Sequence, residues 1–423
     1  SDLDDLQKMG YTEKKAKSML YGGGLKIYTA VDYDVQNALE DVYENYKKMP
    51  DKKVQGAMVV MDYEGRILGL VGGTGKYSGK LGLNRASQSV RQPGSVIKPL
   101  SVYGPAFEKS LQDNNVNIYW STMIEDKPLK KVNGKWWPTN EGGSYSGNSV
   151  SIQYGLSKSL NTVSARTLDK IGVDYSFDYI TQRFHISTLK VQDEDYAPLA
   201  TGSLTNGVTT LEMTAAYATF GNGGVYHKPY CYYKIEDSQG NVLIETDPNA
   251  TKEQALTEST AWLMNKVLQT VMSSGTGTSY KLSNTECFGK TGTTTGSKDR
   301  WFIGGTPEYV AAVWYGYDTP KEIYYKLSPN PSGTIWKTVM TEIYDAKGTE
   351  KKTFPEYDGI VKKGDAWYDK NNMPSSSHFS SDETTKKKSS EASTNADEKT
   401  AAQSDEQTAS AESNEIGRAS CRE

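Results

Sequence analysis

The sequence predicts an α+β fold, in which a central antiparallel five-stranded sheet is flanked by helices and joined to an all-helical subdomain. Two strand-like segments form a hairpin pattern early in the 423-residue chain, and three more appear beyond residue 284. A long helix-rich insertion at about 149–220 separates the two groups. Strands that a helical block interrupts, and that then resume as antiparallel neighbours, are typical of this fold class.

The first elements follow from hydrophobic periodicity. Residues 22–47 predict a strand followed by a helix, because their apolar residues first alternate and then recur at helical spacing. Residues 57–62 and 66–72 are apolar runs on either side of the turn sequence Tyr63-Glu64-Gly65. Such a pair is a hairpin signature, so these runs supply the first two strands of the sheet.

Helices dominate the middle of the chain. Residues 95–110 predict a helix that two prolines shorten or kink. Within the region 149–220, Thr209 and Glu212 have the spacing of a capping box. Gly221 is the expected end of the helix that they open.

Strands and helices alternate in the next part of the chain. A second hairpin-like pair covers 225–236 and 241–245, and a helix runs from about 257 to 274. The three later strands and the final helix are expected at 285–291, 300–305, 309–317 and 333–345. Beyond residue 372 the composition changes abruptly to Ser, Thr, Lys, Glu and Ala, which predicts a disordered tail over 373–423. Its end, 417–423, has the character of an appended sequence.

Composition excludes several classes of function. The formal net charge is −4 and no basic block precedes the tail, which argues against a nucleic-acid partner. No apolar run approaches the roughly 20 residues that span a membrane, and the charged start lacks the apolar core of a signal peptide. Cys231, Cys287 and Cys421 show the spacing of neither a zinc site nor a disulfide framework, although a Cys231–Cys287 bridge stays open.

The stretch Gly289 to Thr294 carries the clearest sign of a binding site. It predicts a short strand in which a glycine, Gly292, lets another molecule approach the backbone closely. The cation Lys290 and the hydroxyls of Thr291 and Thr293 surround that point. Such a strand edge suits an extended peptide that ends in a carboxylate.

A second motif places a serine and a lysine three residues apart. Ser95 follows a Pro-Gly turn, and a helix that begins there puts Ser95 and Lys98 on one face. The first turn of a helix also offers unpaired N–H groups to an oxyanion. Lys98 can act as a base only if burial or a nearby cation, such as Lys290, lowers its pKa. The alternative is an N-capping serine with a solvated lysine.

A third motif, Ser159-Leu160-Asn161, interrupts the helical region between 149–158 and 162–171. Ser159 is a candidate for passing a proton between Lys98 and a leaving amine, and Asn161 for holding a substrate amide. The alternative is that both residues are ordinary helix caps.

Together, Ser-x-x-Lys, Ser-x-Asn and Lys-Thr-Gly resemble the motif set of penicillin-binding proteins and serine β-lactamases, with Leu160 in place of the Asp of Ser-Asp-Asn. Over about 20–365 the chain resembles the transpeptidase domain of a bifunctional (class A) penicillin-binding protein. Further matching stretches are Gly24–Asp32, Asn84–Ala86, Leu204–Val208 and Lys298–Gly304.

The resemblance implies three sections of chain. Residues 1–55 are a linker region with a strand and a helix from an interdomain junction, 56–372 are the transpeptidase domain, and 373–423 are the disordered tail. It also implies a parent protein with an N-terminal glycosyltransferase domain and a membrane anchor. That protein acts on the extracytoplasmic face of the bacterial cell membrane.

The resemblance also implies a mechanism that needs no metal and no organic cofactor. Ser95 attacks the penultimate D-alanine of a peptidoglycan stem peptide, Lys98 is its base, and an amine from a neighbouring stem resolves the acyl-enzyme. β-Lactams acylate the same serine. The implied catalytic residues are Ser95, Lys98, Ser159 and Lys290, and the implied substrate-binding residues are Asn161, Thr291, Gly292 and Thr293. Backbone N–H groups of Ser95 and Thr293 form the implied oxyanion hole.

Other functions remain as alternatives. A serine β-lactamase or a D,D-carboxypeptidase shares the fold and the acyl-enzyme, and a β-lactam sensor uses the same cleft without turnover. In the family, a loop similar to Trp136, Trp137, Pro138 and Asn140 lies near the cleft. The alternative interpretation of this loop is that the tryptophans pack it onto the core.

Overall fold

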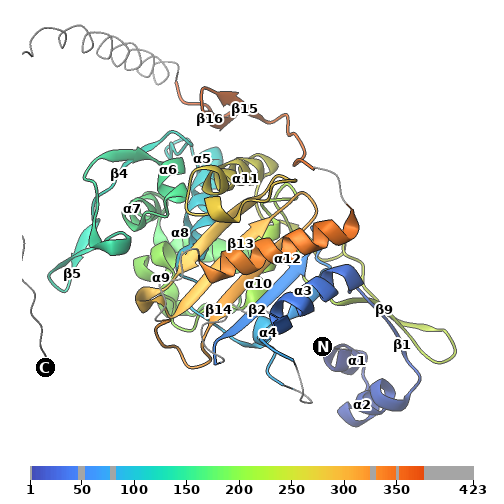
Figure 1. The fold of residues 1–423 in the computed structure, drawn as a ribbon. Coiled ribbons are helices and arrows are strands. Elements are labelled where there is room, and N and C mark those ends of the chain that lie inside the picture. The colour runs from blue at the N-terminus through green and yellow to red at the C-terminus, as the bar shows by residue number, and fades with distance from the viewer. Residues whose placement is uncertain (1, 46–52, 77–81, 324–329, 349–351, 376–423) are drawn as a thin grey trace, which may run out of the picture. The chain divides into compact units, whose positions relative to one another are not determined.

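The structure is a computed structural model that describes residues 2–45, 53–76, 82–323, 330–348 and 352–375 (Figure 1). The chain divides into two compact units, Ser1–Met373 and Pro374–Glu423. All of the elements given below belong to the first unit. The predicted disordered tail lies almost entirely outside the described residues. Among those residues, no helix combines the length and the apolar character needed to cross a membrane.

A five-stranded sheet forms the centre of the first unit. All of its neighbouring strands are antiparallel, and their order is β12-β13-β14-β2-β3. The strands are β12 (Phe288–Thr293), β13 (Asp299–Gly305), β14 (Val310–Gly316), β2 (Gln55–Met61) and β3 (Ile67–Val71). The predicted α+β class and its five-stranded sheet are confirmed, and β12 lies at one edge.

Side-chain alternation along these strands separates two cores. In β2, Ala57 and Val59 join the core beneath the helical insertion, whereas Met58 and Val60 join the core beneath α3 (Tyr33–Asn45) and α12 (Pro331–Lys347). Figure 1 shows α12 and α3 lying over the same face of the sheet. Because both faces are covered, these strands are apolar at nearly every position instead of alternating between apolar and polar.

The helical insertion covers the other face of the sheet. The prolines predicted to kink the region 95–110 divide it into a 3₁₀ turn, a π turn and an α-helix: η1 (Gly94–Ile97), η2 (Pro99–Tyr103) and α5 (Gly104–Gln112). The other helices of this layer are α6 (Ile152–Ser157), α7 (Asn161–Ile171), α8 (Val173–Asp178), η4 (Tyr179–Arg183), α9 (Tyr196–Thr201), α10 (Thr210–Ala218) and α11 (Glu258–Ser273).

The predicted capping box of α10 is present, but the helix ends earlier than expected. Thr209 Oγ1 accepts from the N–H of Glu212, and Glu212 Oε2 accepts from the N–H of Thr209. The helix stops at Ala218 instead of Gly221. A Cβ at Gly221 would overlap the ring of Tyr63, so close packing against that ring, and not helix termination, requires the glycine.

The predicted strand at 225–236 is wrong in part, because it is two strands around Pro229. β8 (Val225–His227) pairs with β11 (Lys252–Gln254), whereas β9 (Tyr232–Glu236) pairs with β1 (Lys26–Thr29) and β10 (Val242–Glu245). The missing N–H of proline explains why the strand breaks there.

Short elements complete the described fold. Three further strand pairs are β4 (Met123–Glu125) with β7 (Ser149–Ser151), β5 (Lys130–Val132) with β6 (Lys135–Trp137), and β15 (Ile360–Lys363) with β16 (Ala366–Asp369). The short helices are α1 (Asp2–Lys8), α2 (Glu13–Gly22), α4 (Arg85–Gln88), η3 (Glu141–Gly143), η5 (Val191–Asp193), η6 (Thr278–Tyr280) and η7 (Thr295–Ser297). Cys287 is a buried free thiol, so the structure contains no Cys231–Cys287 bridge.

Candidate active site

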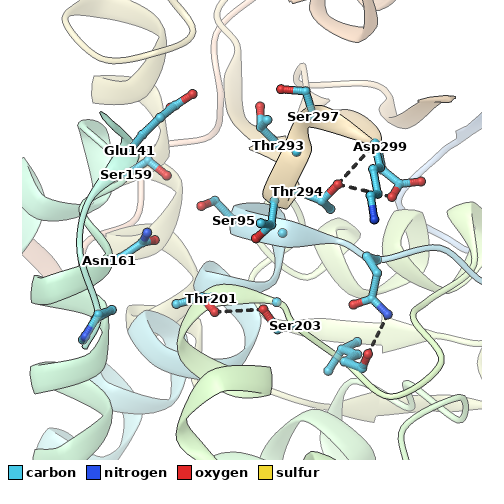
Figure 2. A pocket seen from close by; sticks show the side chains of 18 of the residues that line it. Ser95, Glu141, Ser159, Asn161, Thr201, Ser203, Thr293, Thr294, Ser297 and Asp299 are labelled. Carbon is cyan, nitrogen blue, oxygen red and sulfur yellow. Dashed lines mark hydrogen bonds between the residues drawn. The ribbon is translucent and has the colours of Figure 1, made fainter. Parts of the chain in front are cut away.

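A cleft of about 880 Å³ lies where the edge strand β12 meets η1 and the junction of α6 and α7. Figure 2 shows Ser95 in this cleft, with Ser159 and Asn161 on one side of it and Thr293 and Thr294 on the other. Three motifs that are far apart in the sequence therefore meet at one cavity. Lys98 and Lys290 lie beneath its surface, and both are fully buried.

Backbone packing positions Ser95. Gly94 has a φ of +53°, and a Cβ at this position would lie 2.6 Å from the carbonyl oxygen of Thr293. A Cβ at Gly202 would in turn lie 2.6 Å from the nitrogen of Gly94. Glycine at position 94 both adopts the left-handed conformation and lets the turn contact β12. The backbone at Ser95 is thereby held beside the backbone of Thr293.

Lys98 lies one 3₁₀ turn after Ser95, and in such a turn residues three apart lie one above the other. Its Nζ donates to the carbonyl oxygen of Ser159 at 2.8 Å and to Oδ1 of Asn161 at 2.7 Å. Burial lowers the pKa of Lys98 well below its ordinary 10.5, and the charge of Lys290 lowers it further. The carboxylate of Glu141 acts in the opposite direction. A buried amine with so low a pKa is suited to accept the proton of Ser95.

Lys290 is the second buried amine. Its Nζ donates to Ser159 Oγ and to the carbonyl oxygen of Thr291, both at 2.9 Å. Burial lowers the pKa of Lys290 to about 7, and Glu141 opposes that shift. The expectation that Lys290 lowers the pKa of Lys98 agrees with this arrangement, but burial is the larger cause.

Ser159 contacts both lysines because of its backbone conformation. It occupies the turn between α6 and α7 with a φ of +61°, in the left-handed region. That conformation typically costs a non-glycine residue about 1–2 kcal/mol. The Ser159 carbonyl accepts from Lys98 and its hydroxyl accepts from Lys290. Strain of this kind is concentrated at functional sites.

Asn161 lines the cleft, but its amide already has partners in the protein. Oδ1 accepts from Lys98, and Nδ2 donates to the carbonyl oxygen of Thr139 at 2.9 Å. One N–H of Nδ2 is left over for a ligand. The structure thus adds a contact with Lys98 to the substrate-binding role expected for Asn161.

Strand alternation divides the Lys-Thr-Gly-Thr sequence between two faces. Lys290 pairs with Ile303 of β13, and Gly292 pairs with Trp301. Paired residues lie on the same face of a sheet, and this face is the one that packs against the helical insertion. Thr291 and Thr293 line the cleft. The hydroxyls of Thr291 and Thr276 are 2.6 Å apart.

The expected role of Gly292 changes. Gly292 is buried and does not line the cleft. A Cβ there would lie 2.7 Å from the carbonyl oxygen of Pro93 and 2.9 Å from Cγ1 of Val96. The close approach that this glycine permits is therefore made by the chain's own segment that carries Ser95.

Sequence reasoning gave no role to three polar residues at the site. Arg300 pairs with Thr293 across the β12–β13 hairpin, and its Nη1 donates to Thr293 Oγ1 at 3.0 Å. The sequence signal for Arg300 is its place in the matching stretch Lys298–Gly304. Thr276 and Glu141 line the cleft from segments outside the three motifs. Asn140, expected near the cleft from the family's loop, lines it as well.

Comparisons with known proteins agree with this geometry. A family model described as "Penicillin binding protein transpeptidase domain" matches residues 56–340. Penicillin-binding protein 4 of Bacillus subtilis is 37% identical over 329 residues, which are 77% of this chain and 50% of that protein. Penicillin-binding protein 1A of Clostridium acetobutylicum is 33% identical over 389 residues, which are 86% of this chain and 46% of that protein. The chain thus spans about half the length of these curated relatives.

A solved structure shares the fold. The PonA1 protein from Mycobacterium tuberculosis, in complex with penicillin V, aligns with a TM-score of 0.70 at 23% identity, over 88% of this chain and 97% of that one. The resemblance drawn from the motifs is confirmed by the family model and by the relatives named penicillin-binding protein 1A. The chain belongs to the penicillin-binding protein family and carries its transpeptidase domain.

Proposed function

We propose that this cleft cross-links peptidoglycan stem peptides as a D,D-transpeptidase, through an acyl-enzyme on Ser95. The observation that carries the proposal is the pair of buried lysines that contact Ser159. One of them, Lys98, lies one turn after Ser95, which lines the cleft. We assign this activity to residues 56–372.

Acylation begins with a proton transfer. Neutral Lys98 accepts the Oγ proton of Ser95, and Oγ attacks the carbonyl carbon of the penultimate D-alanine. The oxyanion that forms is held by the N–H groups of Ser95 and Thr293, and one such donor is typically worth about 3 kcal/mol in the transition state. The C–N bond then breaks. The proton on Lys98 passes through the Ser159 hydroxyl to the departing D-alanine amine, which leaves an ester on Ser95.

Deacylation repeats these steps with a second substrate. The amine of a neighbouring stem loses a proton to Lys98 as it attacks the ester carbonyl. The bond to Ser95 Oγ breaks, and Oγ regains a proton from Lys98. The products are a new amide cross-link and the free enzyme.

The edge strand β12 is suited to hold the donor peptide. An extended chain beside β12 brings its terminal carboxylate to the hydroxyls of Thr291 and Thr293, and the cation of Arg300 polarises Thr293. A β-lactam occupies the same place and acylates Ser95. Because the family builds cell wall, we place the whole protein on the extracytoplasmic face of the bacterial membrane, with a membrane anchor and a glycosyltransferase domain.

Mass spectrometry after incubation with penicillin tests the nucleophile. The expected result is one adduct per chain, on the peptide that contains Ser95, and none in Ser95→Ala. An adduct that persists in this variant would refute the assignment. Rapid multiple turnovers of a chromogenic β-lactam would instead indicate a β-lactamase.

A donor peptide ending in D-alanyl-D-alanine, supplied with and without an amine acceptor, separates the remaining functions. An amide product supports the transpeptidase, whereas release of D-alanine with hydrolysis alone indicates a carboxypeptidase. Acylation without any product indicates a sensor.

A further inference from the structure

A buried carboxylate outside the three motifs lies at one end of the network that reaches Lys98. Asp126, directly after β4, is only 4% exposed. Its Oδ1 accepts from Thr162 Oγ1 at 2.6 Å and from Asn140 Nδ2 at 2.7 Å, and its Oδ2 accepts from the N–H of Ser146 at 2.7 Å. Burial alone would raise the pKa of Asp126, but these hydrogen bonds outweigh burial and hold the pKa below its ordinary value. Asp126 is therefore ionised and fixes Asn140.

Asn140 supplies a helix cap that the local sequence lacks. The N-cap residue of α7 is Leu160, which makes no side-chain capping bond. Asn140 lies on a loop about twenty residues earlier in the sequence, and its Oδ1 accepts from the N–H of Asn161 at 2.8 Å and from that of Thr162 at 3.2 Å. These donors are among the first N–H groups of a helix, which have no partner within the helix itself. The cap fixes the start of α7, where Asn161 is the first residue.

The same loop also sets the orientation of the Asn161 side chain. The carbonyl oxygen of Thr139 accepts from Asn161 Nδ2 at 2.9 Å. A carboxamide has a single oxygen, so this bond turns Oδ1 toward Lys98 Nζ, 2.7 Å away. A continuous set of hydrogen bonds thus leads from Asp126 through Asn140 and Asn161 to Lys98.

We propose that Asp126 and Asn140 are positioning residues for acylation, which hold Asn161, and through it the amine of Lys98, in line with Ser95. This inference rests on the proposed function, because it assigns the two residues to the step in which Lys98 takes the Ser95 proton. Neither residue belongs to the three catalytic motifs, and Asp126 does not line the cleft.

The two side chains offer an exchange that tests the contact itself. Asp126 accepts and Asn140 donates at their shared bond. Asn140→Asp places two carboxylates side by side, and Asp126→Asn leaves two amides whose donors and acceptors must compete. The double variant Asp126→Asn/Asn140→Asp restores one donor and one acceptor, and a carboxylate at position 140 still accepts from the N–H groups of α7.

The experiment measures β-lactam acylation by stopped flow, separating the acylation rate constant from the dissociation constant of the non-covalent complex. We expect Asn140→Ala to lower the rate constant by up to roughly 100-fold, because a displacement of about 1 Å has that effect. The dissociation constant should change much less. Asn148→Ala, at an exposed position on the same loop, is the matched control and should acylate like the wild type.

The exchange variant distinguishes positioning from a loss of fold. We expect it to acylate about tenfold faster than Asn140→Asp alone, a size typical of coupled neighbours. The inference is overturned if Asn140→Ala, with a wild-type melting temperature, keeps the wild-type rate constant. It is equally overturned if the loss of acylation rate in the single variants matches their unfolded fraction and the double variant acylates no faster than Asn140→Asp. A wild-type protein that forms no adduct on Ser95 would instead refute the proposed function.

Discussion

Gly292→Ala tests whether β12 positions the proposed nucleophile, Ser95, by direct packing. The added Cβ would lie 2.7 Å from the carbonyl oxygen of Pro93, whereas ordinary carbon–oxygen contacts begin at about 3.3 Å. The turn that carries Ser95 must therefore move by about 0.6 Å, since the opposite side of Gly292 is limited by Trp301, 3.1 Å from the same Cβ. A shift of this size should lower the acylation rate constant roughly tenfold, given that about 1 Å can cost 100-fold.

Gly289→Ala is the matched control on the same strand. Its Cβ would lie 2.7 Å from Cζ of Phe302 and 2.8 Å from Sδ of Met272, side-chain atoms in the core that faces away from Ser95. Overpacking typically costs about 1–3 kcal/mol, so both variants should melt a few degrees lower than the wild type. Stopped-flow acylation should be slowed in Gly292→Ala alone. If folded Gly292→Ala acylates at the wild-type rate, the packing argument is wrong, and a change confined to β-lactam affinity would favour the original substrate-binding interpretation.

Two further predictions concern charge. Glu141 raises the pKa of both buried lysines. Because Lys98 can act as a base only when it is neutral, Glu141→Gln should move the acidic limb of the acylation rate–pH profile toward lower pH. A shift of that limb toward higher pH would contradict this. Lys290, with a pKa of about 7 against an ordinary 10.5, binds fewer protons in the folded than in the unfolded chain between these values. Folding stability should therefore rise with pH over that window, and the rise should be shallower in Lys290→Met; parallel curves in thermal melts of the two proteins would refute the low pKa.

Local patterns in the sequence predicted the parts of the fold and site that depend on local geometry. The hairpin at 57–72 and the helix beginning near Thr257 follow from periodicity, and both are present. The spacing of Ser95 and Lys98 predicted that the two lie on one face, which the 3₁₀ turn of η1 provides.

Features that depend on which distant segments meet were not predictable. The sequence indicates that Gly292 needs close approach, but not that Pro93 is the group that approaches. It indicates caps near Asn161, but not that Asn140 provides the cap from another loop. The partners of β8 and β9 are likewise hidden, although Pro229 within 225–236 was a sequence signal for the break between them.

The order of strands in the sheet has a consequence for when this site can exist. β2, near the start of the chain, pairs with β14, near residue 316, and β12 joins the sheet through β13. Ser95 and Lys98 thus have β12 as a neighbour only when segments about two hundred residues apart in the sequence have come together. Contacts so distant in sequence form late, because closing long loops is entropically costly. We therefore expect the arrangement of Ser95, Lys98 and β12 to be a property of the fully folded protein, and a partly folded chain to lack an organised site.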